Sequence, residues 1–294
     1  MDRLSVAVVG AGVVGVCSAL WLQRSGHQVT LLDRDEPGTG ASYGNACTIA
    51  DYGCIPVNSP SLPKQLPSLL WSANSPLRLD PGYVLRHPVW MLQFLRNCSR
   101  QRVDRIIEAL GSILAGTGHG LDPLIKDCSA GHLFKRNGCA YIYSTQEAFK
   151  SGLPAHEKRA EQGATFEILD ANKIKQLEPG LTLDAKGGVL FNDARHVISP
   201  KSLVDQFFNH FIRTGGTFRR SGVSDVQTGC RIVFEGGENL TADRVVIAAG
   251  AHSCRIRGAG LEDLPLDTER GYHVQYTGQQ ALLQRPIAWA EAGF

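Results

Sequence analysis

Three glycines and one acid near the amino terminus have the spacing that a dinucleotide-binding turn requires. Gly10, Gly12 and Gly15 form a Gly-x-Gly-x-x-Gly pattern, and Asp33 follows. The first glycine permits a tight turn, the second lets the backbone approach phosphates, and the third lets a helix pack closely. A carboxylate at Asp33 can accept both ribose hydroxyls. It would repel a 2′-phosphate, which disfavours NADP, although the neighbouring Arg34 softens that repulsion.

The elements around these residues have the order that positions such a turn. Residues 6–9 are a short apolar run typical of a buried parallel strand, and residues 29–32 form a second one that ends at Asp33. Between them a helix is predicted, with the free N–H groups of its first turn directed at the pyrophosphate. The turn therefore predicts contacts from Val9, Gly10, Ala11, Gly12, Val13, Val14 and Gly15.

Two later segments suggest a larger cofactor domain. Residues 37–46 are rich in glycine and small polar residues, which fits a second loop over the cofactor with Ser42 and Asn45 as donors. A plain polar linker would have a similar composition. Residues 245–248 predict a strand that ends at Ala249-Gly250 and returns the chain to the first sheet, although an ordinary strand and turn would look alike.

Composition narrows the class of protein. The chain has 294 residues and a formal net charge of +2, so neither size nor charge suggests a nucleic-acid partner. Its eight cysteines include no Cys-x-x-Cys pair, and no metal site is predicted. Residues 4–22 carry no charge, but their clustered glycines argue against a signal peptide or a membrane span. We expect a cytoplasmic protein that begins at Met1, without a transmembrane segment.

The middle of the chain predicts a second, less regular region. Seven prolines between residues 56 and 88 interrupt the strand and helix pattern. The arginines at 96, 100, 102 and 105 are interpreted as a solvated helix face. The remaining predictions are helices at 90–95, 103–114, 155–163 and 199–211, a β-hairpin over 133–143 turning at Asn137-Gly138, a strand at 187–191, and a small strand group over 217–235.

Several stretches together resemble one family of flavoproteins. They are Gly10–Gly15, Ser42–Ala46, Ala73–Leu77, Phe94–Cys98, Asp193–Pro200, Val245–Gly250 and Glu269–His273. On these stretches the chain resembles the FAD-dependent D-amino-acid oxidase and glycine oxidase family, and within it the D-amino-acid dehydrogenase small-subunit branch. The first and sixth stretches are common to many flavoproteins, whereas Ser42–Ala46 and the Arg-Gly-Tyr-His run are more specific.

The resemblance implies an α/β (α+β overall) flavoenzyme with a Rossmann-like FAD-binding domain and an interleaved mixed-sheet substrate domain. The FAD-binding domain would comprise residues 1–50 and 191–263, and the substrate domain residues 51–190 and 264–294. FAD would lie across the glycine turn. The resemblance further implies contacts from Asp33, Arg34, Ser42, Asn45, Ala46, Val223, Ala249 and Gly250.

The implied reaction is oxidation of a D-amino acid, or of a related secondary amine such as a hydroxyproline, to an imine that water converts to an oxo acid. Arg270, Tyr272 and His273 are candidates for gripping the substrate carboxylate. There are two alternatives. An NAD-linked dehydrogenase would explain the glycine turn, and a non-catalytic fragment would result if the family's last flavin-binding segment lies beyond residue 294. The electron acceptor would be oxygen, a quinone or a partner subunit, and the protein would be cytoplasmic or peripheral at the inner membrane face.

Overall fold

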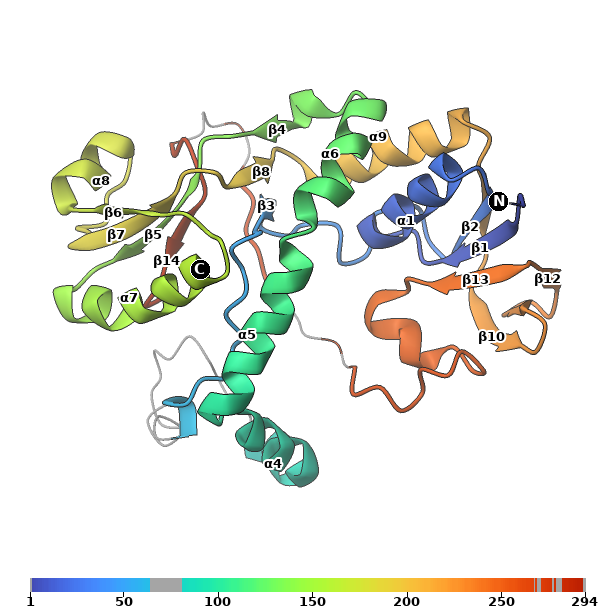
Figure 1. The fold of residues 1–294 in the computed structure, drawn as a ribbon, viewed down its shortest axis with the longest axis horizontal. Coiled ribbons are helices and arrows are strands. Elements are labelled where there is room, and N and C mark those ends of the chain that lie inside the picture. Colours follow the sequence, from blue (N-terminus) through green and yellow to red (C-terminus); the bar gives the residue numbers. More distant parts are fainter. Residues whose placement is uncertain are drawn as a thin grey trace. The chain divides into compact units, whose positions relative to one another are not determined.

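A computed structural model describes residues 2–63, 81–266, 268, 271–276, 278 and 282–292 (Figure 1). The chain divides into two compact units. Unit 1 comprises Met1–Cys47, His119–Lys135 and Val197–Thr277, and unit 2 comprises Thr48–Gly118, Arg136–His196 and Gly278–Phe294. These units differ from the predicted domains in four places. Residues 119–135 and 264–277 belong to unit 1, and residues 48–50 and 191–196 belong to unit 2.

Unit 1 is built on a four-stranded parallel sheet of order β13-β1-β2-β9. The alternation of strand, helix and strand at the amino terminus confirms the predicted Rossmann-like beginning. Its strands are β1 (Ser5–Val9), β2 (Gln28–Asp33), β9 (Thr217–Arg220) and β13 (Arg244–Ile247). Its helices are α1 (Val13–Arg24), α6 (Thr117–Asp127), α9 (Pro200–Arg213) and the 3-10 turns Gly131–Leu133 and Gly250–Arg255; β4 is Phe134–Lys135.

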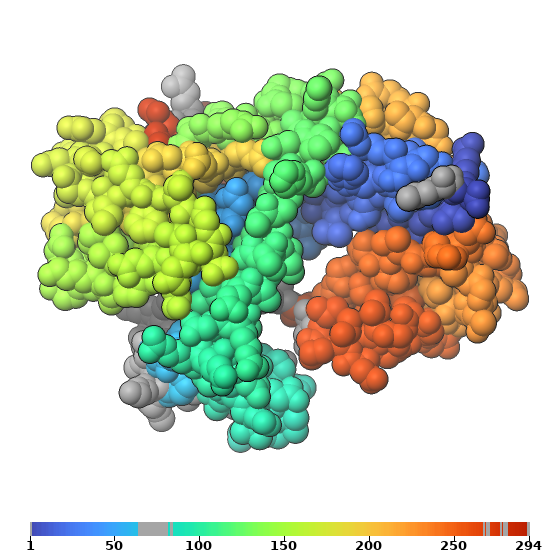
Figure 2. Space-filling view, viewed as in Figure 1, coloured from blue at the N-terminus to red at the C-terminus, as the bar shows by residue number. Residues whose placement is uncertain are grey.

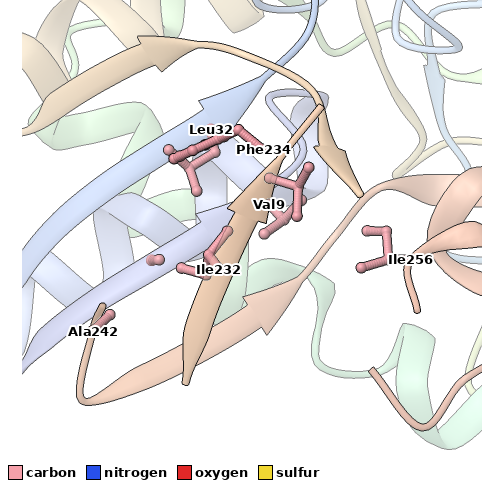
Figure 3. Packing of buried hydrophobic residues seen from close by; sticks show 8 residues of the cluster. Val9, Leu32, Ile232, Phe234, Ala242 and Ile256 are labelled. Carbon is pink, nitrogen blue, oxygen red and sulfur yellow. The ribbon is translucent and has the colours of Figure 1, made fainter. Parts of the chain in front are cut away.

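Layers of different kinds cover the two faces of this sheet. Helices α1 and α9 pack together, and α9 begins at Pro200, where the Ser199 hydroxyl accepts a hydrogen bond from the Ser202 N–H. A second, antiparallel sheet of order β10-β11-β12 contributes the other apolar layer, with β10 at Val223–Gln227, β11 at Arg231–Phe234 and β12 at Asn239–Thr241. Figure 3 shows their shared core, which joins Val9 and Leu32 to Ile232 and Phe234.

Unit 2 contains a mixed sheet of order β14-β5-β7-β6. The bounds are β5 (Cys139–Tyr143), β6 (Glu167–Leu169), β7 (Gly187–Phe191) and β14 (Ile287–Trp289). β14 lies parallel to β5, and the other pairs are antiparallel. Further elements are β3 (Thr48–Ile49), β8 (Arg195–Val197), α3 (Pro81–Arg86), α4 (Pro88–Asn97), α5 (Arg100–Leu114), α7 (Gln146–Glu161) and α8 (Ala171–Leu177).

Separate apolar clusters cover the faces of the mixed sheet. Ile174 of α8 packs with Ala140, Ile142 and Leu190, which are the even-numbered residues of β5 and β7 and lie on one face of the sheet. The opposite cluster is aromatic and contains Phe191, Tyr141 and Phe149 of α7. Because successive strand residues point to opposite faces, the sequence of β5 alone separates these two sets.

Two predictions about strands were wrong. The hairpin over 133–143 does not form, because β5 pairs with β7 and β14 while β4 belongs to another sheet. Gly138 has the left-handed backbone of a turn, but its N–H bonds to the carbonyl of Ala194. Strand β9 is not part of the small strand group either, because it pairs in parallel with β2. Among the residues that the structure describes, no helix is both long and apolar enough to cross a bilayer.

Candidate dinucleotide-binding site

The glycine turn holds β1, β13 and α1 closer together than any side chain would allow. Gly10 has φ +109°, and a Cβ there would stand 2.3 Å from the carbonyl oxygen of Ala248. A Cβ on Gly15 would stand 1.7 Å from the carbonyl oxygen of Gly10. Both contacts involve backbone, so neither neighbour can rotate away. The glycines at these positions are therefore required for the turn itself.

Asp33 lies beside this turn. Its Oδ2 accepts a hydrogen bond from the Ala11 N–H at 2.6 Å, and its Oδ1 accepts one from the Asp35 N–H at 3.0 Å. The side chain is half-buried and lines a cleft in unit 1. Each carboxylate oxygen has a second lone pair. The carboxylate is therefore fixed in place by backbone groups and can still accept hydroxyl donors from the cleft.

The amino terminus of α1 faces the same cleft. Gly12, Val13 and Val14 line it, and the first turn of the helix contains no acidic residue. Ser42 is buried and its Oγ accepts a hydrogen bond from the Val13 N–H at 2.9 Å. The hydroxyl keeps its own proton to donate. Partial positive charge from the helix and a hydroxyl donor thus meet where a phosphate would bind.

The loop that carries Ser42 is shaped by local hydrogen bonds. The side-chain oxygen of Asn45 accepts from the Cys47 N–H at 2.9 Å, and Cys47 has φ 64°. Asn45 lines the cleft and Ala46 does not. Burial raises the pKa of the Cys47 thiol, so this cysteine stays protonated at neutral pH. The loop therefore offers amide and hydroxyl groups to a ligand and no thiolate.

Most of the predicted cofactor-binding residues gather around one cleft of about 520 Å³. That volume falls within the range common for small-molecule sites. Three of the predicted residues do not line the cleft, namely Ala11, Gly15 and Ala46. The predicted residues that line it are Val9, Gly10, Gly12, Val13, Val14, Asp33, Arg34, Ser42, Asn45, Val223, Ala249 and Gly250. Their role in holding FAD stays a prediction.

The sequence prediction missed the far rim of the cleft beyond Asp33. Glu36 lines the cleft and pairs with Arg220 at 2.7 Å, and the Ser221 N–H donates to the Asp33 carbonyl at 2.6 Å. Both contacts depend on β9 lying beside β2, in the register Asp33↔Arg220. The opposite charges of Glu36 and Arg220 were the available signal, but only with the strand order known. Thr39, His252, Ile256 and Thr268 also line the cleft and were missed.

The two substrate-contact candidates that the structure describes, Tyr272 and His273, are not among the residues that line the cleft. Arg270 falls outside the described residues. Tyr272 is 88% exposed, and His273 packs against Gly44 with its ring edge-on to Tyr43, 6.4 Å between centroids. Their role toward a substrate carboxylate stays a prediction.

The cleft fits the ADP half of a dinucleotide. Asp33 offers acceptors for a ribose, α1 offers a positive end for a pyrophosphate, and the Val223 strand forms an apolar wall together with Leu32 and Ile256. The turn after β13 lines the same cleft through Ala249 and Gly250. The cleft thus brings together the kinds of group that an adenosine diphosphate needs.

Comparison with known proteins defines the class. The family described as FAD dependent oxidoreductase matches residues 5–292, and the chain belongs to that family. Its members depend on FAD, and the Rossmann-like unit 1 is the part of this chain where the cofactor motif lies.

Curated relatives come from the same class. The chain is 32% identical over 276 residues to a D-amino-acid oxidase of Bradyrhizobium diazoefficiens, covering 92% of this chain and 65% of that protein. It is 30% identical over 284 residues to D-amino acid dehydrogenase 2 of Ralstonia nicotianae, covering 92% and 66%. The chain thus spans somewhat less than two thirds of the length of these relatives.

Solved structures support the fold. Glycine oxidase from Geobacillus kaustophilus superposes with a TM-score of 0.58 at 20% identity, covering 87% of this chain and 58% of that one. Iminodiacetate oxidase from Chelativorans sp. BNC1 gives 0.54 at 20% identity, covering 85% and 56%. At this identity the likeness concerns the fold alone.

Proposed function

We propose that this chain belongs to an enzyme that oxidises D-amino acids, or a related secondary amine such as a hydroxyproline, to imines that hydrolyse to oxo acids. Bound FAD supplies the hydride acceptor for such chemistry. The proposal rests on family membership together with relatives that carry the names D-amino-acid oxidase and D-amino acid dehydrogenase. An NAD-linked dehydrogenase would account for the glycine turn but not for this family match.

One observation carries the structural side of the proposal: the Asp33 carboxylate stands 2.6 Å from the Ala11 N–H at the glycine turn. This contact joins Asp33, at the end of β2, to the glycine turn that follows β1. The distance between the proposed ribose acceptor and the proposed phosphate-binding turn is therefore fixed before a ligand binds. A preset spacing lowers the cost of ordering the site, and this favours a tightly held cofactor over a dissociable one.

The chain's own residues would have defined tasks. Asp33 binds the adenosine ribose, Ser42 donates to a phosphate oxygen, and the backbone of Ala249 and Gly250 covers the pyrophosphate. Asn45 also lines the cleft and would donate toward the ring end of the cofactor. Arg270, Tyr272 and His273 keep their proposed role toward the substrate carboxylate. Oxygen, a quinone or a partner subunit would then accept the electrons.

The test is anaerobic reduction of the purified, FAD-loaded protein by a panel of D-amino acids and cyclic secondary amines. Bleaching of the flavin absorbance near its visible maximum by a D-amino acid, and not by its L-enantiomer, is the expected result. The matched control is the Asp33→Ala protein. It should bind less flavin, but the flavin that it does bind should be reduced at the same rate. A loaded protein whose flavin is reduced by NADH and by no amine would contradict the proposal.

A further inference from the structure

The loop that follows β2 controls one of the two hydrogen bonds that hold the side chain of Asp33. Residues 34–36 line the cleft of unit 1, and the Asp35 N–H donates to Oδ1 of Asp33 at 3.0 Å. The Ala11 N–H donates to Oδ2 at 2.6 Å. A carboxylate turns easily about its last bond unless both oxygens are held. The position of Asp35 therefore decides where the remaining lone pairs of Asp33 point.

The far end of this loop is anchored to the rest of unit 1. The Gly38 N–H donates to the Ala11 carbonyl at 2.9 Å. Gly38 has φ +72°, and a Cβ there would stand 2.9 Å from a methyl group of Val204 on α9. The far end is therefore held by the glycine turn and by α9, whereas the first residues of the loop need another anchor.

Arg220 supplies that anchor. It is the last residue of β9 and lies in register with Asp33. Its Nη1 pairs with Oε1 of Glu36 at 2.7 Å, and its Nε donates a longer hydrogen bond to the Arg34 carbonyl, at 3.4 Å. These two acceptors lie on either side of Asp35 in the sequence. One planar guanidinium thus bridges the residue whose N–H holds Asp33.

The strand order brings these groups together from distant parts of the sequence. β9 pairs in parallel with β2, and the Ser221 N–H donates to the Asp33 carbonyl at 2.6 Å, so the backbone next to Arg220 is fixed as well. In Figure 2 the blue amino-terminal atoms of unit 1 lie against its orange atoms, as the pairing of β1 with β13 requires. Arg220 is not among the residues that line the cleft. It is therefore placed to act on a bound ligand through the loop.

The Arg220–Glu36 pair is too exposed to serve mainly as a stabilising contact. The two side chains are 57% and 60% exposed. Exposed ion pairs contribute little to the free energy of unfolding, because water and salt screen them. Removing this pair should therefore leave the fold intact and change the geometry of the loop.

We propose that Arg220, together with Glu36, is a positioning residue that aims the Asp33 carboxylate at the adenosine ribose. The inference rests on the proposed function, which places the ADP half of FAD in this cleft. With Arg220 in place, both oxygens of Asp33 are held and each keeps a lone pair for a ribose hydroxyl. Without it, the Asp35 N–H loses its fixed position, and the carboxylate can rotate about its single contact with Ala11.

The test compares two nucleotides by isothermal titration calorimetry on the purified chain freed of flavin. ADP has both ribose hydroxyls, and 2′,3′-dideoxy-ADP has neither. The unchanged chain should bind ADP about thirtyfold more tightly, because hydrogen bonds to a charged acceptor are lost with the hydroxyls. Arg220→Gln should lower this preference to about threefold, and Glu36→Gln should lower it similarly, since either change removes the ion pair.

A matched control separates position from charge. Arg244→Gln removes an exposed arginine from the first residue of β13, at the opposite end of the same parallel sheet, and should keep the full preference for ADP. A general loss of positive charge would weaken both nucleotides by the same factor and leave their ratio unchanged. Urea denaturation checks that each variant is folded, and Glu36→Gln alone decides the question if Arg220→Gln does not fold.

The double variant tests whether the two residues act as one unit. Arg220→Gln combined with Glu36→Gln should lose no more of the preference for ADP than either single variant loses, because both changes break the same contact. Fully additive losses would overturn the inference, as would an undiminished preference in the single variants or an equal loss in Arg244→Gln. Failure of the proposed cofactor site looks different. The unchanged chain would then bind no ADP, or bind the two nucleotides equally, and the inference would fall with it.

Discussion

Two carboxylates, one in each unit, show how differently the molecule uses its acid groups. Asp33 of unit 1 accepts two backbone hydrogen bonds and still lines a cleft. Glu178 of unit 2 is 1% exposed and both of its oxygens are engaged, one by Arg285 at 2.7 Å and one by the Gln284 N–H at 2.8 Å. The comparison separates an acid that keeps acceptor capacity for a ligand from one that is satisfied by its own chain.

The same contrast extends to the neighbouring groups. Around Asp33 the partners are backbone N–H groups of a turn and of a short loop, which only a substitution by proline would remove. Around Glu178 the partner is a charged side chain that is itself mostly buried. Substitution at Glu178 should therefore act on stability, whereas substitution at Asp33 should act mainly on cofactor binding.

The largest expected effect is at Glu178. Glu178→Ala should lower the free energy of unfolding by about 4 kcal/mol, because it leaves the mostly buried Arg285 charge without its carboxylate partner. Asp184→Ala, which removes the 83% exposed partner of Lys186, should cost less than about 1 kcal/mol. Urea denaturation measures both. Equal losses in the two variants would show that the buried Glu178–Arg285 pair stabilises the fold no more than the exposed Asp184–Lys186 pair does.

An acid-sensitive contact lies in the aromatic cluster of unit 2. His156 is 1% exposed, 2.8 Å from the Tyr143 hydroxyl and 3.1 Å from the Arg159 guanidinium. Arg159 can only donate, so Nδ1 must accept and the imidazole is neutral. Burial, with a smaller contribution from Arg159, lowers the pKa of His156 from 6.5 to about 4.

This lowered pKa gives a pH dependence of defined sign. Between pH 4 and 6.5 the unfolded chain binds a proton that the folded chain does not, so the free energy of unfolding rises with pH. The contribution is complete above pH 6.5, and about 3 kcal/mol is lost as the pH falls to 4. His156→Gln should flatten that part of the stability profile, and His132→Gln, at an exposed histidine, should not. A profile unchanged by His156→Gln would refute the assignment.

At Asp33 the expected effect is on binding. Asp33→Asn keeps the size of the side chain but removes a charge-assisted acceptor, which is worth about 2 kcal/mol. The dissociation constant for FAD should rise about thirtyfold, measured by quenching of flavin fluorescence. Glu262→Gln, an exposed acid of the same unit, is the matched control and should bind FAD as the unchanged chain does. If Asp33→Asn lost as much stability as Glu178→Ala, the conclusion that Asp33 acts mainly on cofactor binding and Glu178 on stability would be wrong.

The smallest effect is expected at Ser42. Ser42→Ala removes a neutral hydroxyl that accepts from the Val13 N–H and can donate to a phosphate. The FAD dissociation constant should rise about fivefold, since a neutral hydrogen bond is worth about 1 kcal/mol. Ser112→Ala on α5, whose hydroxyl bonds to the Ala109 carbonyl, serves as a control and should leave FAD affinity unchanged. An effect at Ser42 larger than at Asp33 would reverse the ranking of charge over hydroxyl.

Local patterns carried most of what could be predicted. The glycine turn, α1, β2 and the return strand β13 follow from apolar runs and glycine spacing within short windows. Pairing between strands that are distant in the sequence could not be predicted from such windows. Strand β1 pairs with β13 and β2, and β9 then pairs with the second edge of β2, which no local pattern indicates. The Glu178–Arg285 pair joins residues 107 positions apart, and no local pattern links them.

The Gly138 turn shows a further reason for error. Asn-Gly flanked by apolar residues is a strong hairpin signal, and Gly138 does have a left-handed backbone. The strand after it nevertheless pairs with β7, whose buried Val189, Leu190 and Phe191 offer more apolar surface than the two-residue β4. Tertiary burial thus outweighed a correct local signal.

Competition between ADP and FAD tests the central claim most directly. If the cleft between the glycine turn and Asp33 holds the ADP half of the cofactor, ADP should displace FAD from the purified chain, and Asp33→Asn should weaken both ligands by the same factor. If FAD binds and ADP does not compete, or if the chain binds no FAD at all, the assignment of this cleft is wrong.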